Sequence, residues 1–176
     1  MLRVTAGIAK NKVLVALEGN TRPVTDRIKI KVFDLLREYI SAARVLDLFA
    51  GSGAYGIEAL SRGAKSAVFI EENLAACEIL QKNITNCGFN ELSEVICGSL
   101  PQALNKCTGE FDIIFCDPPF NQMEKFNLAN YLGIISNQNI FVLRLPADVS
   151  LDKYKNLIVH SEIVGISYLY FLRQPK

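Results

Sequence analysis

Glycines and carboxylates recur where predicted strands end in the first half of the chain. The segment Gly51-Ser52-Gly53-Ala54-Tyr55-Gly56 has the spacing G-x-G-x-x-G between a predicted strand and a predicted helix. Glycine lets the backbone approach a ligand closely, and the first turn of a helix offers free N–H groups. Glu71 ends the following strand, where a carboxylate suits the two hydroxyls of a ribose. The pattern predicts a ligand that contains a nucleoside.

Asp47 narrows the choice of ligand. It lies four residues before Gly51 within an otherwise apolar strand, where a buried carboxylate needs a partner. A pyrophosphate group would be repelled by this carboxylate, whereas a cationic amino or sulfonium group would be attracted. S-adenosylmethionine carries both cations and no phosphate, so Asp47 favours it over a dinucleotide. The alternative is that Asp47 only caps the backbone of the glycine loop.

A second candidate site follows the apolar strand 111–116. The tetrapeptide Asp117-Pro118-Pro119-Phe120 lacks two N–H donors and presents a carboxylate and carbonyls as acceptors. Such acceptors suit the exocyclic amino group of a nucleobase: Asp117 and the Pro118 carbonyl would orient it and help to receive its proton. Phe120 could stack on a base that has left its helix. An ordinary turn before a helix is the alternative for these residues.

Alternating strands and helices place both candidate sites at one edge of a sheet. Strands are expected at 43–49, 65–71, 92–97, 111–116 and 139–145, and helices at 54–62, 73–86, 99–107 and 124–135. This order predicts a parallel sheet with helices on both faces and a ligand crevice at the carboxyl ends of the strands. Two more strands, at 157–163 and 166–173, are joined by a turn at Gly165 and predict an antiparallel pair at one sheet edge.

The first 40 residues differ in charge from the rest of the chain. They hold eight Lys or Arg against four Asp or Glu, while the other 136 residues hold 11 against 14, for a total of +1. Segments 2–6 and 12–17 predict a small hairpin, and Thr25 is the expected N-cap of a helix. That helix carries an apolar stripe at positions 28, 32, 35, 36, 39 and 40. We expect a basic arm that could bind phosphates, attached to a slightly acidic core.

Composition excludes several other classes of protein. The chain has 176 residues, 50% of them hydrophobic, which is typical of one globular domain. A single histidine, His160, excludes a His-rich metal site, and we expect no metal. Five cysteines without a C-x-x-C spacing indicate small, reduced core residues and therefore a cytosolic protein. No apolar run reaches the length of a membrane span, so we expect no membrane partner.

The motifs together resemble those of a known family. VLDLFAGSGAYGIEALSRGA, FIEEN and DPPF look like successive motifs of class I S-adenosylmethionine-dependent methyltransferases. The segments RVTAG at 3–7 and RPVTDR at 22–27 resemble the N-terminal signatures of the RsmD-type family, the bacterial 16S ribosomal RNA guanine-N2 methyltransferases. The resemblance is colinear over nearly the whole chain and is strongest over 22–72 and 111–120.

The resemblance implies a fold, an activity and a set of site residues. The fold is a Rossmann-like α/β, seven-stranded sheet, mostly parallel with an antiparallel edge hairpin. An RNA-contacting β-hairpin extension covers 1–24 and the methyltransferase domain covers 25–176. The implied activity is methylation of a guanine N2 in 16S ribosomal RNA, within an assembling or assembled small subunit, by a cytoplasmic monomer that uses S-adenosylmethionine. The implied cofactor-binding residues are Asp47, Phe49, Ala50, Gly51, Ser52, Gly53, Glu71 and Ser99. The implied catalytic residues are Asp117, Pro118, Pro119 and Phe120, and the implied RNA-binding residues are Arg3, Lys10, Lys12, Arg22 and Arg27.

Three positions depart from the family pattern. Ser99 stands where an acid near the end of the third strand is usual, Val24 replaces a threonine, and Ile30 replaces an acid. Ser99 can hydrogen-bond to an adenine amino group but supplies no charge. Three other functions remain open: an adenine-N6 methyltransferase of DNA or RNA, which shares DPPF; an NAD-dependent oxidoreductase, which shares the glycine loop and Glu71; and a non-catalytic RNA-binding assembly factor.

Overall fold

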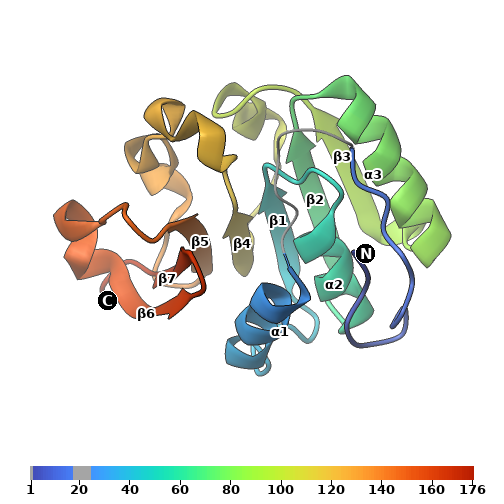
Figure 1. Ribbon diagram of the computed structural model, residues 1–176, viewed down its shortest axis with the longest axis horizontal. Helices are drawn as coiled ribbons and strands as arrows, with labels where there is room; N and C mark the ends of the chain where they lie inside the picture. Colours follow the sequence, from blue (N-terminus) through green and yellow to red (C-terminus); the bar gives the residue numbers. More distant parts are fainter. Residues whose placement is uncertain (1, 18–24) are drawn as a thin grey trace.

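A seven-stranded sheet forms the centre of the computed structural model, which describes residues 2–17 and 25–176 (Figure 1). Its strand order is β3-β2-β1-β4-β5-β7-β6. The strands are β1 (Arg44–Leu48), β2 (Ser66–Glu71), β3 (Ser93–Cys97), β4 (Ile113–Cys116), β5 (Ile140–Pro146), β6 (Ile158–Val164) and β7 (Ser167–Leu172). All pairs from β3 across to β5 are parallel, and β7 is antiparallel to both β5 and β6. The predicted sheet with an antiparallel edge is confirmed.

Helices cover both faces of this sheet, but those on the two faces differ in kind. One face is covered by α1 (Asp26–Leu35), α2 (Ala54–Ser61) and α3 (Leu74–Cys87). The other is covered by short 3₁₀ segments, η2 (Gln102–Lys106), η4 (Leu128–Ile134) and η5 (Asp152–Leu157); η1 (Asn90–Leu92) precedes β3, and η3 (Phe120–Lys125) follows the DPPF aspartate. Within the described residues, no helix is long and apolar enough to cross a membrane.

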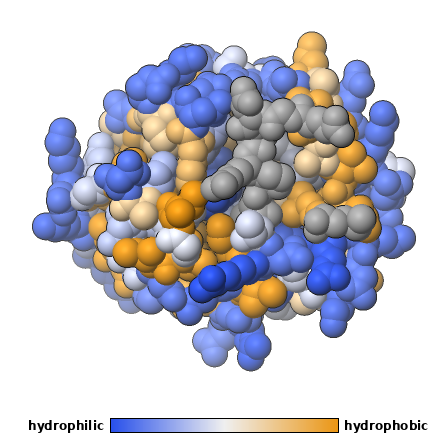
Figure 2. Space-filling view, viewed as in Figure 1, coloured by the Kyte–Doolittle hydropathy of each residue, from blue (hydrophilic) through white to orange (hydrophobic). Residues whose placement is uncertain are grey.

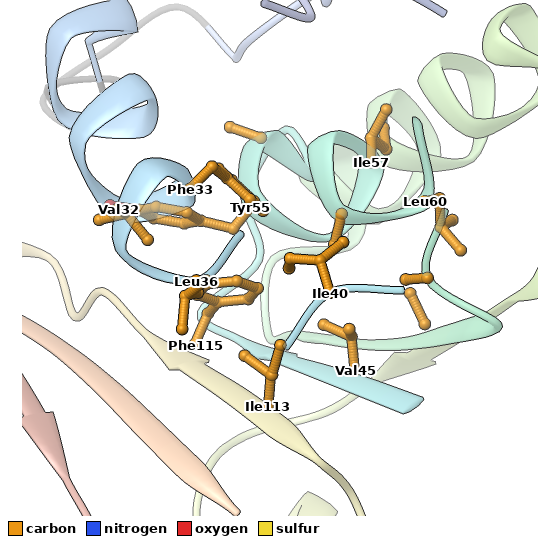
Figure 3. Close-up of a cluster of buried hydrophobic side chains, with 14 of the residues drawn as sticks. Val32, Phe33, Leu36, Ile40, Val45, Tyr55, Ile57, Leu60, Ile113 and Phe115 are labelled. Atoms are coloured by element: carbon orange, nitrogen blue, oxygen red, sulfur yellow. The ribbon is translucent and has the colours of Figure 1, made fainter. Parts of the chain in front are cut away.

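The larger core lies between the sheet and the α-helices. Val45 of β1 and Ile113 of β4 point into it, and Figure 3 shows Phe33, Leu36 and Ile57 from the helical layer packed nearby. Aromatic rings bind α1 and α2 to the sheet, because Phe115 lies 5.6 Å from Phe33 and stacks on Tyr55 at 5.0 Å. Burial of these apolar side chains drives the association of the two layers.

The surface seen in Figure 2 is mixed in character. Hydrophilic side chains dominate its rim, and hydrophobic ones form separate patches among them. Large apolar side chains that are exposed include Val159, Ile163 and Ile166 near the edge strand β6. Scattered exposed apolar residues of this kind are usual in folded domains and indicate no particular function.

The N-terminal arm, residues 2–17, is less regular than its predicted hairpin. The expected strands at 2–6 and 12–17 are reduced to one antiparallel bridge between Arg3 and Val13. The segments still cross by backbone hydrogen bonds, for example from Leu14 N to Leu2 O at 2.9 Å. Val4, Ala9 and Leu14 are buried in the same core as the helices. The arm also hydrogen-bonds to side chains of α2 and α3, which interrupts the pairing between its two segments.

Three helix predictions need correction. The stripe predicted through Ile40 ends early: α1 stops at Leu35, and both Leu35 and Tyr39 are exposed. The expected N-cap is confirmed, because Thr25 Oγ accepts from Ile28 N at 3.4 Å. Helix 99–107 is a 3₁₀ segment from Gln102 to Lys106, and helix 124–135 is replaced by the two 3₁₀ segments η3 and η4. Apolar spacing alone does not separate these short segments from an α-helix.

The prediction that all five cysteines are reduced is wrong for one pair. Cys77 in the first turns of α3 and Cys97 at the end of β3 form a disulfide, with their Cα atoms 6.3 Å apart. That separation is within the usual range for bonded cysteines. No spacing signal marks the pair, because the two residues meet only through the packing of α3 on the sheet.

Close packing at Gly56 predicts a measurable loss of stability on substitution. A Cβ at this position would lie 2.2 Å from a ring atom of Phe69, which is buried in β2. We expect Gly56→Ala to lower the free energy of unfolding by about 1–3 kcal/mol, the usual effect of overpacking. Urea denaturation measures the difference. Gly133→Ala is the matched control, since a Cβ there would meet no atom within 4 Å; equal stabilities would contradict the close contact.

Candidate active site

Four charged side chains occupy the carboxyl edge of the sheet on its α-helical face. Side chains alternate between the two faces of a strand. Val45 and Phe69 face the α-helices, so Asp47 and Glu71, two residues later in each strand, face the same way. The same alternation applies to Asp117 after β4 and to Arg144 in β5. β1 and β4 are neighbours at the point where the strand order reverses, which is where α/β folds bind ligands.

The glycine loop between β1 and α2 turns sharply and is bound to β2 by Glu71. Phe49, Gly51 and Gly53 all have left-handed backbones, with φ of 58°, 53° and 80°. The Glu71 carboxylate accepts from Gly51 N at 2.8 Å and from Asn73 N at 2.9 Å. A Cβ on Gly51 would meet no atom within 4 Å. The loop therefore presents open space beside the carboxylate that was predicted to hold a ribose.

Asp47 is almost fully buried, and its Oδ2 accepts from Gly56 N at 2.8 Å. The backbone-capping alternative for Asp47 is therefore observed, but it uses one oxygen only. Burial raises the pKa of Asp47 well above its ordinary value, and the negative charges of Asp117 and Glu71 raise it further. A cation near this carboxylate would reverse that shift. These carboxylates thus fit a ligand with a positive charge and do not fit a phosphate.

The remaining predicted cofactor-binding residues range from buried to exposed. Ala50 is buried and its N–H donates to Ile70 O at 2.9 Å. The Ser52 carbonyl accepts from Asn83 Nδ2 at 2.9 Å. Phe49 points into an aromatic cluster with Phe126 and Tyr131, at 6.4 and 6.2 Å. Ser99 is exposed, one residue after Gly98, whose N–H donates to Glu71 O. Phe49 thus belongs to an aromatic cluster beside the glycine loop, and Ser99 is exposed after β3.

Asp117 is paired with an arginine that the sequence analysis did not select. Arg144 Nη1 donates to both Asp117 oxygens, at 3.2 and 2.9 Å. Burial raises the pKa of Asp117, and the charge of Arg144 opposes this rise. The buried Tyr55 hydroxyl lies near Asp117 and, after Arg144, also lowers the pKa of this carboxyl. Pro118 is buried, and Phe120 is partly exposed. The site combines an acceptor, a partly open aromatic ring and a supporting cation.

Four of the five predicted RNA-binding residues lie in the described part of the chain. Lys10, Lys12 and Arg27 are exposed and carry no salt bridge to another described residue. Arg3 is also exposed, but its Nε lies 3.2 Å from Asp26 Oδ2. Arg22 falls outside the described residues, so its predicted role has no structural counterpart. The exposed basic residues are available to an external anion, whereas Arg3 would share its charge with Asp26.

Sequence reasoning missed the residues that connect the arm to the site. Glu58 and Lys29 are both fully buried and lie 3.3 Å apart. Asn83 accepts from Val15 N and donates to Val15 O, besides its contact with the glycine loop. Neither set has a sequence signal. Arg144 did have one, because a lone charge in the apolar segment FVLRLP resembles Asp47 in VLDLF.

The fold is that of the class I S-adenosylmethionine-dependent methyltransferases. An RNA methyltransferase from Salinibacter ruber, solved with S-adenosyl-L-homocysteine, shares this fold at a TM-score of 0.69, with 16% identity over 88% of this chain and 95% of that one. A hypothetical protein from Thermus thermophilus aligns with a TM-score of 0.84 and 26% identity over 98% and 99% of the two chains.

Sequence comparison places the chain within one family of that class. The family described as Conserved hypothetical protein 95 matches residues 2–173. The Ribosomal RNA small subunit methyltransferase D of Haemophilus influenzae is 39% identical over 163 residues, which cover 89% of this chain and 82% of the relative. The chain belongs to this family, the RsmD family of methyltransferases. The predicted resemblance is confirmed, and an oxidoreductase is no longer favoured.

Proposed function

We propose that this protein transfers a methyl group from S-adenosylmethionine to the N2 amino group of a guanine in 16S ribosomal RNA. The observation that carries the proposal is the position of Asp117-Pro118-Pro119-Phe120 at the carboxyl end of β4, beside the glycine loop that follows β1. The relative from Haemophilus influenzae is named a ribosomal RNA small subunit methyltransferase, which supports ribosomal RNA as the substrate. When bound, S-adenosylmethionine supplies an electrophilic methyl group on a sulfonium.

The residues of the chain would mainly position the two reactants. Glu71 and the glycine loop hold the ribose and the methionine moiety, and Asp47 attracts the cationic end. Asp117 and the Pro118 carbonyl accept hydrogen bonds from the amino group, which keeps its lone pair directed at the methyl carbon. As the nitrogen–carbon bond forms, the carbon–sulfur bond breaks and Asp117 helps to remove one amino proton. Phe120 stacks on the base that has left its helix.

The acceptors of Asp117 suit guanine. A carboxylate only accepts hydrogen bonds, and its two oxygens together have about four acceptor positions. Guanine presents N1–H next to its N2 amino group, so two neighbouring donors can face the carboxylate that Arg144 contacts. Adenine-N6 methyltransferases share the same tetrapeptide, so the choice of guanine over adenine rests on the resemblance to the guanine-N2 family.

Mass analysis of the modified nucleoside tests the proposal. The enzyme is incubated with methyl-labelled S-adenosylmethionine and, separately, with free 16S RNA and with small subunits that lack the modification. The expected product is N2-methylguanosine at one position. Production of N6-methyladenosine would overturn the choice of guanine, and transfer to neither substrate would favour the non-catalytic assembly factor. A comparison of the two substrates shows which form of the RNA is recognised.

The exposed basic residues of the arm should contribute to RNA affinity. We propose that residues 1–24 contact RNA while residues 25–176 carry the catalytic site, and Lys10 and Lys12 are exposed cations of the described arm. The double variant Lys10→Ala, Lys12→Ala should weaken the binding of RNA whatever the RNA sequence. It should also reduce the slope of log affinity against log salt by about 1 for each phosphate that the variant no longer binds. Filter binding across a salt series measures this.

Two lysines on the opposite side of the fold provide the control for that measurement. Lys106 and Lys153 are exposed and belong to η2 and η5, which cover the other sheet face. Their double alanine variant removes the same charge. An equal loss of affinity and slope in both variants would show that only net charge matters and would remove the arm from the interface.

A further inference from the structure

We propose that Arg144 is a positioning residue that holds both base-contacting groups, Asp117 and Phe120, in the geometry needed for methyl transfer. The inference rests on the proposed function, because it assumes that these two residues meet the target base. Arg144 lies in β5 and only 6% of its surface is exposed. Asp117 and Arg144 directly follow Cys116 and Leu143, which are register partners on the neighbouring strands β4 and β5.

The guanidinium of Arg144 is fixed by three contacts at once. Nη1 donates to Asp117 Oδ2 at 2.9 Å, Nε donates to Ser167 Oγ at 3.1 Å, and Cζ lies 4.6 Å from the centre of the Phe120 ring. Ser167 itself is fully buried at the start of β7. A planar, rigid guanidinium can satisfy all three contacts, whereas a lysine ammonium is a point charge on a flexible stem. The antiparallel edge of the sheet is thereby connected to the candidate site.

The first consequence concerns the charge of Asp117. Three other titratable groups surround it in this part of the site: Asp47 on β1, Tyr55 on α2 and Cys116 on β4. None of these is a cation, so Arg144 supplies the positive charge that opposes the burial of Asp117. A protonated Asp117 would lose acceptor capacity toward an amino group and could not take up its proton. Arg144 therefore favours the ionised form of Asp117, which is the form that accepts from an amino group.

The second consequence concerns the ring of Phe120. A cation over one face of an aromatic ring attracts it electrostatically. Phe120 begins η3 and remains partly exposed, so ring surface is still available to a base. By holding Phe120, Arg144 reduces the freedom that would otherwise be lost when a base stacks on it. The same side chain thus aligns the acceptor and the stacking ring.

Two substitutions separate these consequences. Arg144→Met removes the charge but keeps a similar length, and Arg144→Lys keeps the charge but loses the planar face. Arg173→Met is the matched control: Arg173 also lies over an aromatic ring, Tyr39 at 5.9 Å, and donates from Nε to a carbonyl, that of Asn139. For each variant we would measure S-adenosylmethionine affinity by calorimetry, kcat and KM for RNA, and the pH profile of kcat.

The expected results differ between the variants. Arg144→Met should lower kcat about 100-fold. Loss of the cation raises the pKa of Asp117, which must be ionised to act. The acid limb of the pH profile of kcat should therefore move to higher pH in Arg144→Met. Arg144→Lys should keep the acid limb close to that of the unmodified protein but raise the KM for RNA. Arg173→Met should change neither quantity, and all three variants should bind S-adenosylmethionine normally. The inference is overturned if Arg144→Met keeps the kcat and pH profile of the unmodified protein. It is also overturned if Arg144→Lys has the same KM for RNA as the unmodified protein.

A measurement independent of turnover distinguishes this inference from the proposed function. Carbon-13 NMR of the Asp117 carboxyl group reports its titration directly. In Arg144→Met the titration of Asp117 should move to higher pH, whereas in Arg144→Lys it should stay close to that of the unmodified protein. If the unmodified protein methylates no RNA but this shift is seen, the proposed function fails and the role of Arg144 toward Asp117 stands. An unchanged titration overturns the role of Arg144 even if the enzyme is active. Should Arg144→Met fail to fold, Arg144→Gln, which is also uncharged, decides between these outcomes.

Discussion

Asp117→Asn should lower the rate of methyl transfer about 10³-fold while S-adenosylmethionine binds with unchanged affinity. The substitution keeps the size of the side chain but removes its charge and its ability to take up a proton. Groups that accept a proton in a transition state contribute roughly 10²–10⁴-fold to rate. Asp117 lies after β4, whereas the contacts of the glycine loop are made by Asp47 on β1 and Glu71 on β2. Single-turnover kinetics with labelled methyl donor, together with calorimetry, measure the two quantities.

The control uses a carboxylate that adjoins the other end of the same strand. Asp112 lies just before β4, is exposed, and accepts from Arg44 N at 2.7 Å. Asp112→Asn makes the same chemical change at the opposite edge of the sheet, and it should leave turnover close to that of the unmodified protein. Unchanged turnover in Asp117→Asn would remove Asp117 from its assigned role. An equal loss in both variants would indicate a general effect on the fold.

Glu58→Gln should lower the free energy of unfolding by about 3–5 kcal/mol, the usual effect of removing one partner from a buried ion pair. Glu58 in α2 has no exposed side-chain surface and lies 3.3 Å from Lys29, which is equally buried. Its carboxylate also accepts from Thr5 N at 2.8 Å and Ala6 N at 3.0 Å, and from Arg62 Nε at 2.8 Å. Glutamine cannot balance the Lys29 charge. Lys29 would remain buried with only the Arg3 carbonyl and the more distant Asp26.

Two further variants show whether the loss comes from the unpaired lysine. Lys29→Met combined with Glu58→Gln removes both charges, and it should recover part of the stability that Glu58→Gln loses. Glu162→Gln is the control for a surface pair, since Glu162 and Lys31 are 2.9 Å apart but partly exposed; its effect should stay below about 1 kcal/mol. Urea denaturation measures all three. A loss in Glu58→Gln no larger than in Glu162→Gln would contradict the prediction.

The arrangement of the candidate site could be predicted from the sequence because its signals are local. Each strand of the parallel sheet is a short apolar run, and the polar residues of the site interrupt or follow these runs. Asp47, the glycine loop and DPPF could therefore be placed at one edge before any contact was known. The antiparallel pair β6–β7 was equally accessible, because Gly165 stands between two segments without a helical pattern.

The parts that could not be predicted depend on contacts between distant segments. The buried pair Lys29–Glu58 joins residues 29 positions apart, and each looks like an ordinary surface charge on a helix. The Cys77–Cys97 bond also forms only once α3 packs on β3. The predicted hairpin strands are shortened for a related reason, because several backbone N–H groups of the arm donate to the Glu58 and Ser61 side chains of α2. Local preference was overridden by tertiary contacts in each case.

The alternation that brings the polar side chains to one face also limits how the chain can vary in length. Asp47 in β1 and Arg144 in β5 each lie an even number of residues from Val45 and Val142, which face the α-helices. Loss of one residue inside either strand would turn the charged group into the apolar core on the other side and expose apolar groups to the site. The pairing of β6 with β7 already contains a register shift between Ile158 and His160, and β6 carries no site residue. Gain or loss of a single residue is therefore more tolerable along this outer edge, while the inner strands must keep a fixed register for the site.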